Sequence, residues 1–199
     1  MIKNKKVYIC ALFSVLLLAT IFSTALYLTS VDGEKNSVKI GENRIDISED
    51  FDPPDELRVG ENSYQKEVAI ENTGNTDAYI RVFLDFSSSD ISSISEISSD
   101  GGETFYSYDE FKNHIPENWE YVPSGILGGY FYYKIPVCPG EKTPNLITNV
   151  KTTFSSAIDV DEYDVIVYAE SVQTIDKDGI PFPGDTAWAS SWIEFIQRK

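Results

Sequence analysis

The sequence has 199 residues and a formal net charge of −16, with 16 basic against 32 acidic side chains. A surface of this sign repels nucleic acid and anionic lipid, and no basic stripe is present to bind either, so we expect no nucleic-acid partner. The hydrophobic content of 42%, with 11 Phe, 12 Tyr and 3 Trp, argues against disorder and is enough for the core of one domain.

The first 25 residues have the pattern of a secretory signal peptide. Met1–Lys6 is basic, Val7–Phe22 is almost purely apolar, and small residues at 23–25 precede a cleavage site between Ala25 and Leu26. The competing interpretation is a permanent anchor, because residues 7–31 carry no charge and a membrane span needs about 20 residues. In both cases the lysines before the apolar segment place the body outside the membrane, so we expect a secreted protein of the cell surface or extracellular matrix.

Alternating apolar residues predict strands in the first half of the body. Residues 37–48 alternate around a break at 41–43, which predicts a hairpin or a bulged strand. Residues 52–55 (DPPD) predict a turn or an extended loop, because proline donates no ladder hydrogen bond. Gln65–Asn72 and Ala78–Phe86 are strand-like runs joined by the sequence TGNT, a pattern that predicts a hairpin.

The middle of the chain is predicted to combine a polar loop with aromatic strands. Ser87–Gly102 is rich in Ser and Asp and predicts a surface loop with one helical turn, inside an insertion that spans about residues 87–108. A further turn of helix is expected at Asp109–His114. Trp119–Val122 and Tyr130–Val137 predict strands, and the second of them leads into a type II turn at Pro139-Gly140.

The last third predicts two strands and a helix. Leu146–Phe154 and Tyr163–Ser171 are the strands, and the second is almost continuously apolar, which indicates a central place in its sheet. Thr186–Phe195 predicts a short helix. Seven to nine strands with closely spaced turns predict an all-β domain over residues 41–199, a jelly-roll-like antiparallel β-sandwich with one or two short helices.

The sequence offers little for catalysis. His114 is the only histidine and lies in a polar FKNHIPEN context, and there is no HExxH, CxxC or glycine-rich phosphate motif. Cys10 belongs to the leader, so Cys138 is left without a partner for an internal disulfide and is interpreted as a buried small hydrophobe. We therefore expect no enzyme, no catalytic residues and no cofactor.

Two remaining patterns bear on binding. Acids cluster at residues 50–56 and 159–164, but the second cluster lacks the glycine turn and terminal glutamate of a calcium loop, so solvated loops without metal are preferred. Trp119 and the run Tyr130-Phe131-Tyr132-Tyr133 could form a carbohydrate platform, although alternation places half of a strand's side chains in the core. A monomeric glycan-binding module or adhesin accessory is therefore the alternative function.

Several blocks occur in an order that points to one family. They are the leader ending in STA, then LYLTS and NSVKIGENRIDI, VAIENTGNTDAYIRV, GYFYYKIPVCPGEKTPNL and DVIVYAESVQ. In this order the sequence resembles the TasA/camelysin family of exported matrix proteins, particularly its clostridial-type members. The resemblance implies a jelly roll, processing by a dedicated signal peptidase of the SipW type, and polymerisation into biofilm fibres. The metallopeptidase activity attributed to the family lacks its HExxH motif here.

The resemblance also implies how the copies join. The mature N-terminal segment, residues 26–40, would act as a donor strand for the next copy, with main-chain hydrogen bonds and alternate apolar side chains. A head-to-tail contact of this kind grows filaments because it does not close on itself. The expected partners are other copies of the chain, the signal peptidase and other matrix proteins. The side chains expected to carry the contact are Leu26, Tyr27, Leu28, Val38 and Ile40.

Overall fold

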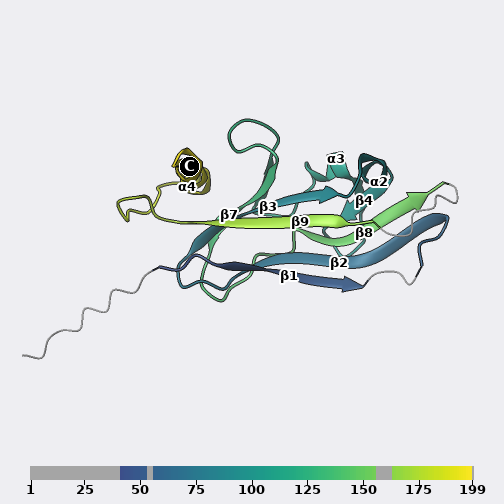
Figure 1. The fold of residues 1–199 in the computed structure, drawn as a ribbon, viewed down its shortest axis with the longest axis horizontal. Coiled ribbons are helices and arrows are strands. Elements are labelled where there is room, and N and C mark those ends of the chain that lie inside the picture. The colour runs from purple at the N-terminus through teal and green to yellow at the C-terminus, as the bar shows by residue number, and fades with distance from the viewer. Residues whose placement is uncertain (1–40, 53–55, 156–162, 199) are drawn as a thin grey trace, which may run out of the picture. The chain divides into compact units, whose positions relative to one another are not determined.

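The computed structural model describes residues 41–52, 56–155 and 163–198. In these residues two antiparallel sheets pack as a sandwich with three short helices (Figure 1). The expected jelly-roll-like antiparallel β-sandwich is thus confirmed, with three short helices where one or two were expected. The predicted signal peptide, the Ala25–Leu26 cleavage site and the whole donor segment with Leu26, Tyr27, Leu28, Val38 and Ile40 lie outside the described residues.

The strands divide between the sheets in a pattern that leaves four of them at edges. The first sheet has the order β1-β2-β8-β4-β5 and the second the order β6-β7-β3-β9. The first sheet consists of β1 (Ile45–Asp52), β2 (Gly60–Asn72), β8 (Ile147–Phe154), β4 (Ser95–Ser98) and β5 (Tyr106–Ser107). The second consists of β6 (Trp119–Val122), β7 (Tyr130–Val137), β3 (Ala78–Phe86) and β9 (Val165–Gln173). The predicted bounds of β3, β6 and β7 are confirmed.

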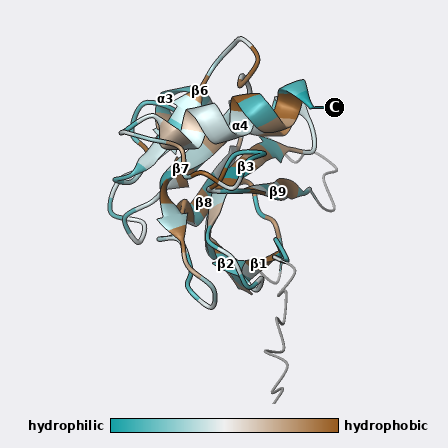
Figure 2. Ribbon diagram, turned by 90° about the vertical axis from the view of Figure 1, so that its left-hand side faces the viewer, coloured by the Kyte–Doolittle hydropathy of each residue, from teal (hydrophilic) through white to brown (hydrophobic). Residues whose placement is uncertain are grey.

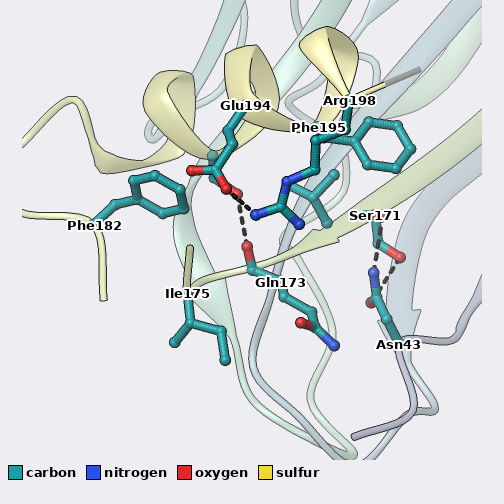
Figure 3. Close-up of a pocket in the computed structure, with 10 residues that line it drawn as sticks. Asn43, Ser171, Gln173, Ile175, Phe182, Glu194, Phe195 and Arg198 are labelled. Atoms are coloured by element: carbon teal, nitrogen blue, oxygen red, sulfur yellow. Dashed lines mark hydrogen bonds and ion pairs between the residues drawn. The ribbon is translucent and has the colours of Figure 1, made fainter. Parts of the chain in front are cut away.

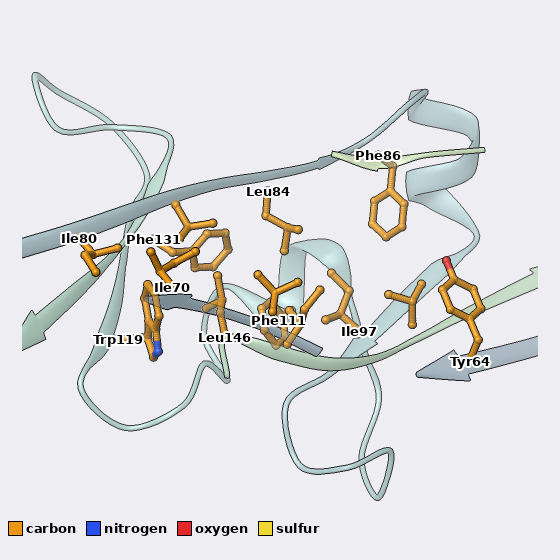
Figure 4. Close-up of a cluster of buried hydrophobic side chains, with 14 of the residues drawn as sticks. Tyr64, Ile70, Ile80, Leu84, Phe86, Ile97, Phe111, Trp119, Phe131 and Leu146 are labelled. Atoms are coloured by element: carbon orange, nitrogen blue, oxygen red, sulfur yellow. The ribbon is translucent and has the colours of Figure 1, made fainter. Parts of the chain in front are cut away.

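The main core lies between the sheets, where alternate side chains from each sheet meet. Ile70 of β2, Ile80 of β3 and Phe131 of β7 are fully buried there. Trp119 and Phe111 pack into the same cluster (Figure 4). The period-2 alternation of the predicted strands therefore corresponds to this inter-sheet surface.

The predicted hairpin between β2 and β3 is wrong. The two runs are strands, but β2 pairs with β1 and β8 while β3 pairs with β7 and β9, so the connection crosses from one sheet to the other. The residues predicted as a hairpin turn instead form an arch, a connection that joins a strand of one sheet to a strand of the other. Gly74 is required because a Cβ there would collide with the backbone of Glu42 and Arg44.

The buried side chain of Asn72 holds this arch together. Its Nδ2 donates hydrogen bonds to the carbonyl oxygens of Thr76 (2.8 Å) and Val137 (2.7 Å). Its Oδ1 accepts a hydrogen bond from the Gly74 N–H (3.0 Å). An amide that satisfies three backbone groups in the core favours the crossover over a simple hairpin.

The helical turn predicted in the Ser/Asp-rich segment is confirmed as α2 (Ser89–Ser93), which is capped by Ser88. The surface loop predicted around it is wrong in part, because the residues after α2 form β4, which pairs with β8 inside the first sheet. Ile97 is fully buried in the main core. The buried hydroxyls of Ser95 and Thr152 hydrogen-bond each other (2.9 Å). The polar group of Ser95 therefore has a hydrogen-bond partner within the sheet and does not need to reach solvent. The turn of helix expected nearby is confirmed as α3 (Tyr108–Phe111).

The turn after β4 yields a prediction about pH. Asp100 Oδ1 accepts hydrogen bonds from Ser98 Oγ (2.6 Å) and the Thr104 N–H (2.9 Å), and these bonds lower the pKa of the Asp100 carboxyl from 3.8 to about 2. Since the folded pKa lies below the unfolded one, the ionised carboxylate stabilises the fold above pH 3.8. That contribution is lost as pH falls towards about 2. NMR titration should give a carboxyl midpoint near 2 that Ser98→Ala moves towards 3.8, whereas an unchanged midpoint would contradict the assignment.

The predicted C-terminal helix is confirmed as α4 (Ala187–Gln197) and covers part of the outer face of the second sheet. Trp188 and Trp192 pack with Tyr79 of β3, Tyr132 of β7 and Val172 of β9 in a second cluster. Figure 2 shows α4 lying across this sheet on the side away from β2. None of the helices in the described part combines the length and apolar character of a membrane crossing.

Candidate functional site

The two edge strands β1 and β9 border the same side of the sandwich. Asn43, just before β1, donates from Nδ2 to the carbonyl oxygen of Ser171 on β9 (2.9 Å), and Ser171 Oγ donates to Asn43 Oδ1 (2.9 Å). We call the strip between β1 and β9 the open side. The prediction that β9 is central is wrong, because β9 lies at the edge of its sheet. Its apolar composition has another cause, since its residues pack against the main core on one face and against the α4 cluster on the other.

The free backbone groups of β9 can be assigned from its pairing with β3. The Ser87 N–H donates to the carbonyl oxygen of Asp164 (2.9 Å), so even-numbered residues of this strand direct their backbone groups towards β3. In an antiparallel strand the direction alternates, and residues 165, 167, 169 and 171 therefore face the edge. The bond that Ser171 accepts from Asn43 agrees with this assignment. No strand of the described chain pairs with that edge.

The same alternate residues of β9 point their side chains at the core. Val165, Val167 and Ala169 pack against the main cluster but are only partly buried. Across the open side, Ile47 is 41% and Phe51 49% exposed on β1. Both edges thus leave apolar side chains half covered, and an added strand would remove that surface from water.

Charge distinguishes the two edges. β1 has the sequence IDISEDFD, with four acids in eight residues, and such charges protect an edge strand from pairing with another chain. β9 has the sequence VIVYAESVQ, whose single charged residue, Glu170, is paired with Arg81. The edge of β9 is therefore the unprotected one, and it is the candidate site for binding an extended peptide segment.

A chain of hydroxyl groups closes the other end of the open side. Tyr163 Oη donates to Tyr64 Oη (2.9 Å) and also hydrogen-bonds Thr152 Oγ1 (2.8 Å). Burial, and then the hydrogen bond with Tyr163, raises the pKa of Tyr64 far above its ordinary value, so the phenol stays protonated. From Tyr163, two residues before β9, to Ser171 the chain advances eight residues, roughly 26 Å when extended at about 3.3 Å each, which sets the length of segment that fits.

The residues considered for catalysis do not assemble into a reactive site. His114 is exposed, stacks on Tyr106 with ring centroids 4.0 Å apart, and hydrogen-bonds the Glu110 carbonyl oxygen through Nδ1 (2.9 Å). Within residues 41–52, 56–155 and 163–198, no three His, Cys, Asp or Glu side chains gather closely enough to hold a metal ion. Asp55 and most of the acidic cluster at 159–164 lie outside the described residues.

Cys138 is exposed, so its interpretation as a buried small hydrophobe is wrong. Val137 is the last core residue of β7, and Cys138 begins the predicted turn, in which Gly140 has φ +80° and the Glu141 N–H donates to the Cys138 carbonyl oxygen (3.0 Å). The hydrogen bond with the Glu141 side chain and the nearby Asp77 raise the pKa of the thiol, which keeps it protonated and weakly nucleophilic.

Most of the aromatic residues considered as a carbohydrate platform are buried. Phe131 and Tyr132 are fully buried, and Trp119 is 4% exposed. Phe131 faces the main core while Tyr132 faces Trp188 of α4, with ring centroids 5.0 Å apart. Packing therefore accounts for these side chains, as the alternation of β7 indicates, and they do not form an exposed platform.

Sequence reasoning missed Asn43 and Ser171, the two residues that connect β1 and β9 at one end of the open side. The only sequence signal was the polar break at 41–43 in an otherwise alternating run. No family model matches this sequence, and no curated protein matches it. The support for a function therefore comes from the geometry of the open side and from the resemblance described above.

Proposed function

We propose that this protein is a secreted structural subunit of extracellular biofilm matrix fibres, with a structural and not an enzymatic role. Residues 26–40 of one copy pair with the β9 edge of the next, and the contact repeats head to tail. The observation that carries the proposal is the unprotected apolar edge of β9, whose alternate backbone groups pair with no strand of the described residues and whose core-facing side chains are half covered. Other copies, a dedicated signal peptidase and other matrix proteins are the proposed partners.

The segment and the edge match in pattern. A strand added to β9 gains main-chain hydrogen bonds at residues 165, 167 and 169, and its alternate side chains cover the apolar strip. Residues 26–40 have apolar side chains near both ends, at 26–28 and at 38 and 40. Because donor and acceptor are different surfaces of the same chain, each added copy presents a new free edge, and growth does not terminate.

The test compares two lengths of the secreted protein and two variants of the longer one. Protein beginning at Leu26 should form concentration-dependent filaments in electron microscopy, whereas protein beginning at Gly41 should remain monomeric with an unchanged β-rich circular dichroism spectrum. In the longer protein, Val38→Asp should prevent assembly, and Ser37→Asp, the same change on the opposite face of the strand, should not. Equal assembly by the proteins that begin at Leu26 and Gly41 would refute the donor-strand proposal.

A further inference from the structure

The outer face of the second sheet is covered by α4 at one end. There α4 lies over the last residues of β9, and Ser191 Oγ donates a hydrogen bond to the carbonyl oxygen of Gln173 (2.6 Å) (Figure 3). Towards the start of β9 the side chains of the same face are exposed. Tyr168 is 52% and Ile166 43% exposed, and neither belongs to a core cluster of the described residues. Part of this face is therefore accessible to a ligand.

Three aromatic side chains form a row across the accessible part of the face. Phe83 of β3 is directly opposite Tyr168 of β9, and its ring meets that of Tyr130 of β7, with ring centroids 6.1 Å apart. Val82 and Leu84 are buried in the main core, so Phe83 between them faces outward. Residues directly opposite each other in a sheet share a face, so Tyr168 faces outward as well. The row spans two strand spacings, about 10 Å.

Polar and charged groups border this row. Asp85 lies one alternation further along β3 on the same face, opposite Ile166. On the other side of the row, the guanidinium of Arg81 lies 4.0 Å from the centroid of the Tyr130 ring, and Tyr168 Oη donates to Glu170 Oε1 (3.4 Å). The pairing of Arg81 with Glu170 leaves little net charge here, although the whole chain carries −16.

This combination of groups suits a neutral polysaccharide. A sugar ring has an apolar face of C–H groups that packs on an aromatic ring, and its hydroxyl groups hydrogen-bond phenol and carboxylate oxygens. A row of about 10 Å corresponds to about two linked sugar rings. The ring planes of Phe83 and Tyr130 are inclined by 62°, which favours a single soluble chain over a flat crystalline surface. We propose that Tyr168, Phe83 and Tyr130 bind a neutral polysaccharide chain on this face.

Area and charge argue against a protein as the occupant. A stable interface buries about 800 Å² on each partner, whereas an aromatic side chain contributes about 150–250 Å² even when it is wholly exposed. Tyr168 is 52% exposed and the other two rings are less exposed, so the row supplies less than half of that area. A second copy or an acidic polymer would also bring negative charge to a chain that already carries −16.

Affinity electrophoresis of the secreted protein in native gels tests this inference. The neutral probes are soluble hydroxyethylcellulose and galactomannan, and the acidic probe is polygalacturonate. At least one neutral probe should retard the protein, and Tyr168→Ala should weaken that binding by about tenfold or more, because it removes the most exposed ring of the row. The control is Phe51→Ala, which truncates an aromatic side chain of similar exposure (49%) on β1 of the other sheet and should leave the binding unchanged.

The outcomes separate this inference from the fibre proposal. Retardation by neither neutral probe, or by polygalacturonate alone, would overturn the polysaccharide assignment, and so would equal retardation of Tyr168→Ala and the parent protein. Because Tyr168 lies on the outer face of β9 and not on its free edge, Tyr168→Ala should leave filament formation unchanged. Loss of filaments with unchanged retardation would instead identify the row as a contact between copies and would overturn the inference.

Discussion

Replacing Trp192 with alanine is expected to lower the free energy of unfolding by about 3–5 kcal/mol, the range for removing a large aromatic side chain from a core. Trp192 is fully buried in the cluster beneath α4. The centroid of its ring lies 5.9 Å from the ring centroid of Tyr132 and 5.8 Å from that of Phe195. The guanidinium of Arg81 lies 4.2 Å from the centroid of the Trp192 ring. Since α4 has no side-chain cap at its start, its stability depends on packing contacts of this kind.

A conservative substitution provides the control for this prediction. Trp192 Nε1 is buried and has no hydrogen-bond partner among the described residues, so Trp192→Phe removes an unsatisfied donor together with part of the ring. Urea unfolding should therefore show a clearly smaller loss for Trp192→Phe than for Trp192→Ala. If the two losses were equal, or if alanine cost less than about 1 kcal/mol, α4 would not be held by this side chain.

The strands whose signal is local were predictable from the sequence. The bounds of β3, β6 and β7 could be predicted directly, because an alternating pattern depends only on neighbouring residues. The same holds for the turn after β7, which is indicated by Gly140. The short helix α4 was also visible from its composition. Even β4 carries a local signal, because Ile97 alternates with polar residues, but the serines around it outweighed that signal.

Pairing partners could not be predicted in the same way. The sequence TGNT is equally suitable for a hairpin and for an arch, and the choice depends on Asn72 reaching Val137, a residue 65 positions away. The edge position of β9 was hidden for a similar reason, because α4 covers part of its outer face and makes an edge strand look central in composition. The open side consequently became visible only in the folded structure.

The ion pair between Arg81 and Glu170 gives the second large prediction. These residues are directly opposite each other on β3 and β9, and their side chains are only 8% and 20% exposed. Burial lowers the pKa of Arg81, but its hydrogen bonds with Tyr132 and Glu170 outweigh that effect and keep the pKa above its ordinary value. The guanidinium is therefore charged wherever the protein is folded, and Glu170→Gln leaves that charge without its partner.

We expect Glu170→Gln to cost about 3–5 kcal/mol in urea unfolding, the range for breaking a buried pair by removing one partner. The control is Glu120→Gln on the same sheet. Glu120 pairs with Lys134 at 3.8 Å, but both side chains are more than a third exposed, so the loss should stay below about 1 kcal/mol. Equal losses at the two sites would mean that water screens the pair between Arg81 and Glu170 as well.

The double variant Arg81→Met/Glu170→Leu should recover most of the lost stability, since an apolar replacement of a buried pair is often neutral. The assembly of the double variant shows whether Glu170 contacts the incoming strand through its charge or acts only by holding β9 in place. The pair lies on the outer face of β9, opposite the side chains that an added strand would cover, so it acts on the edge only by holding β9 against β3. Filaments should therefore weaken in Glu170→Gln and return in the double variant. If they stayed weak in a double variant of normal stability, Glu170 would have to contact the incoming strand itself.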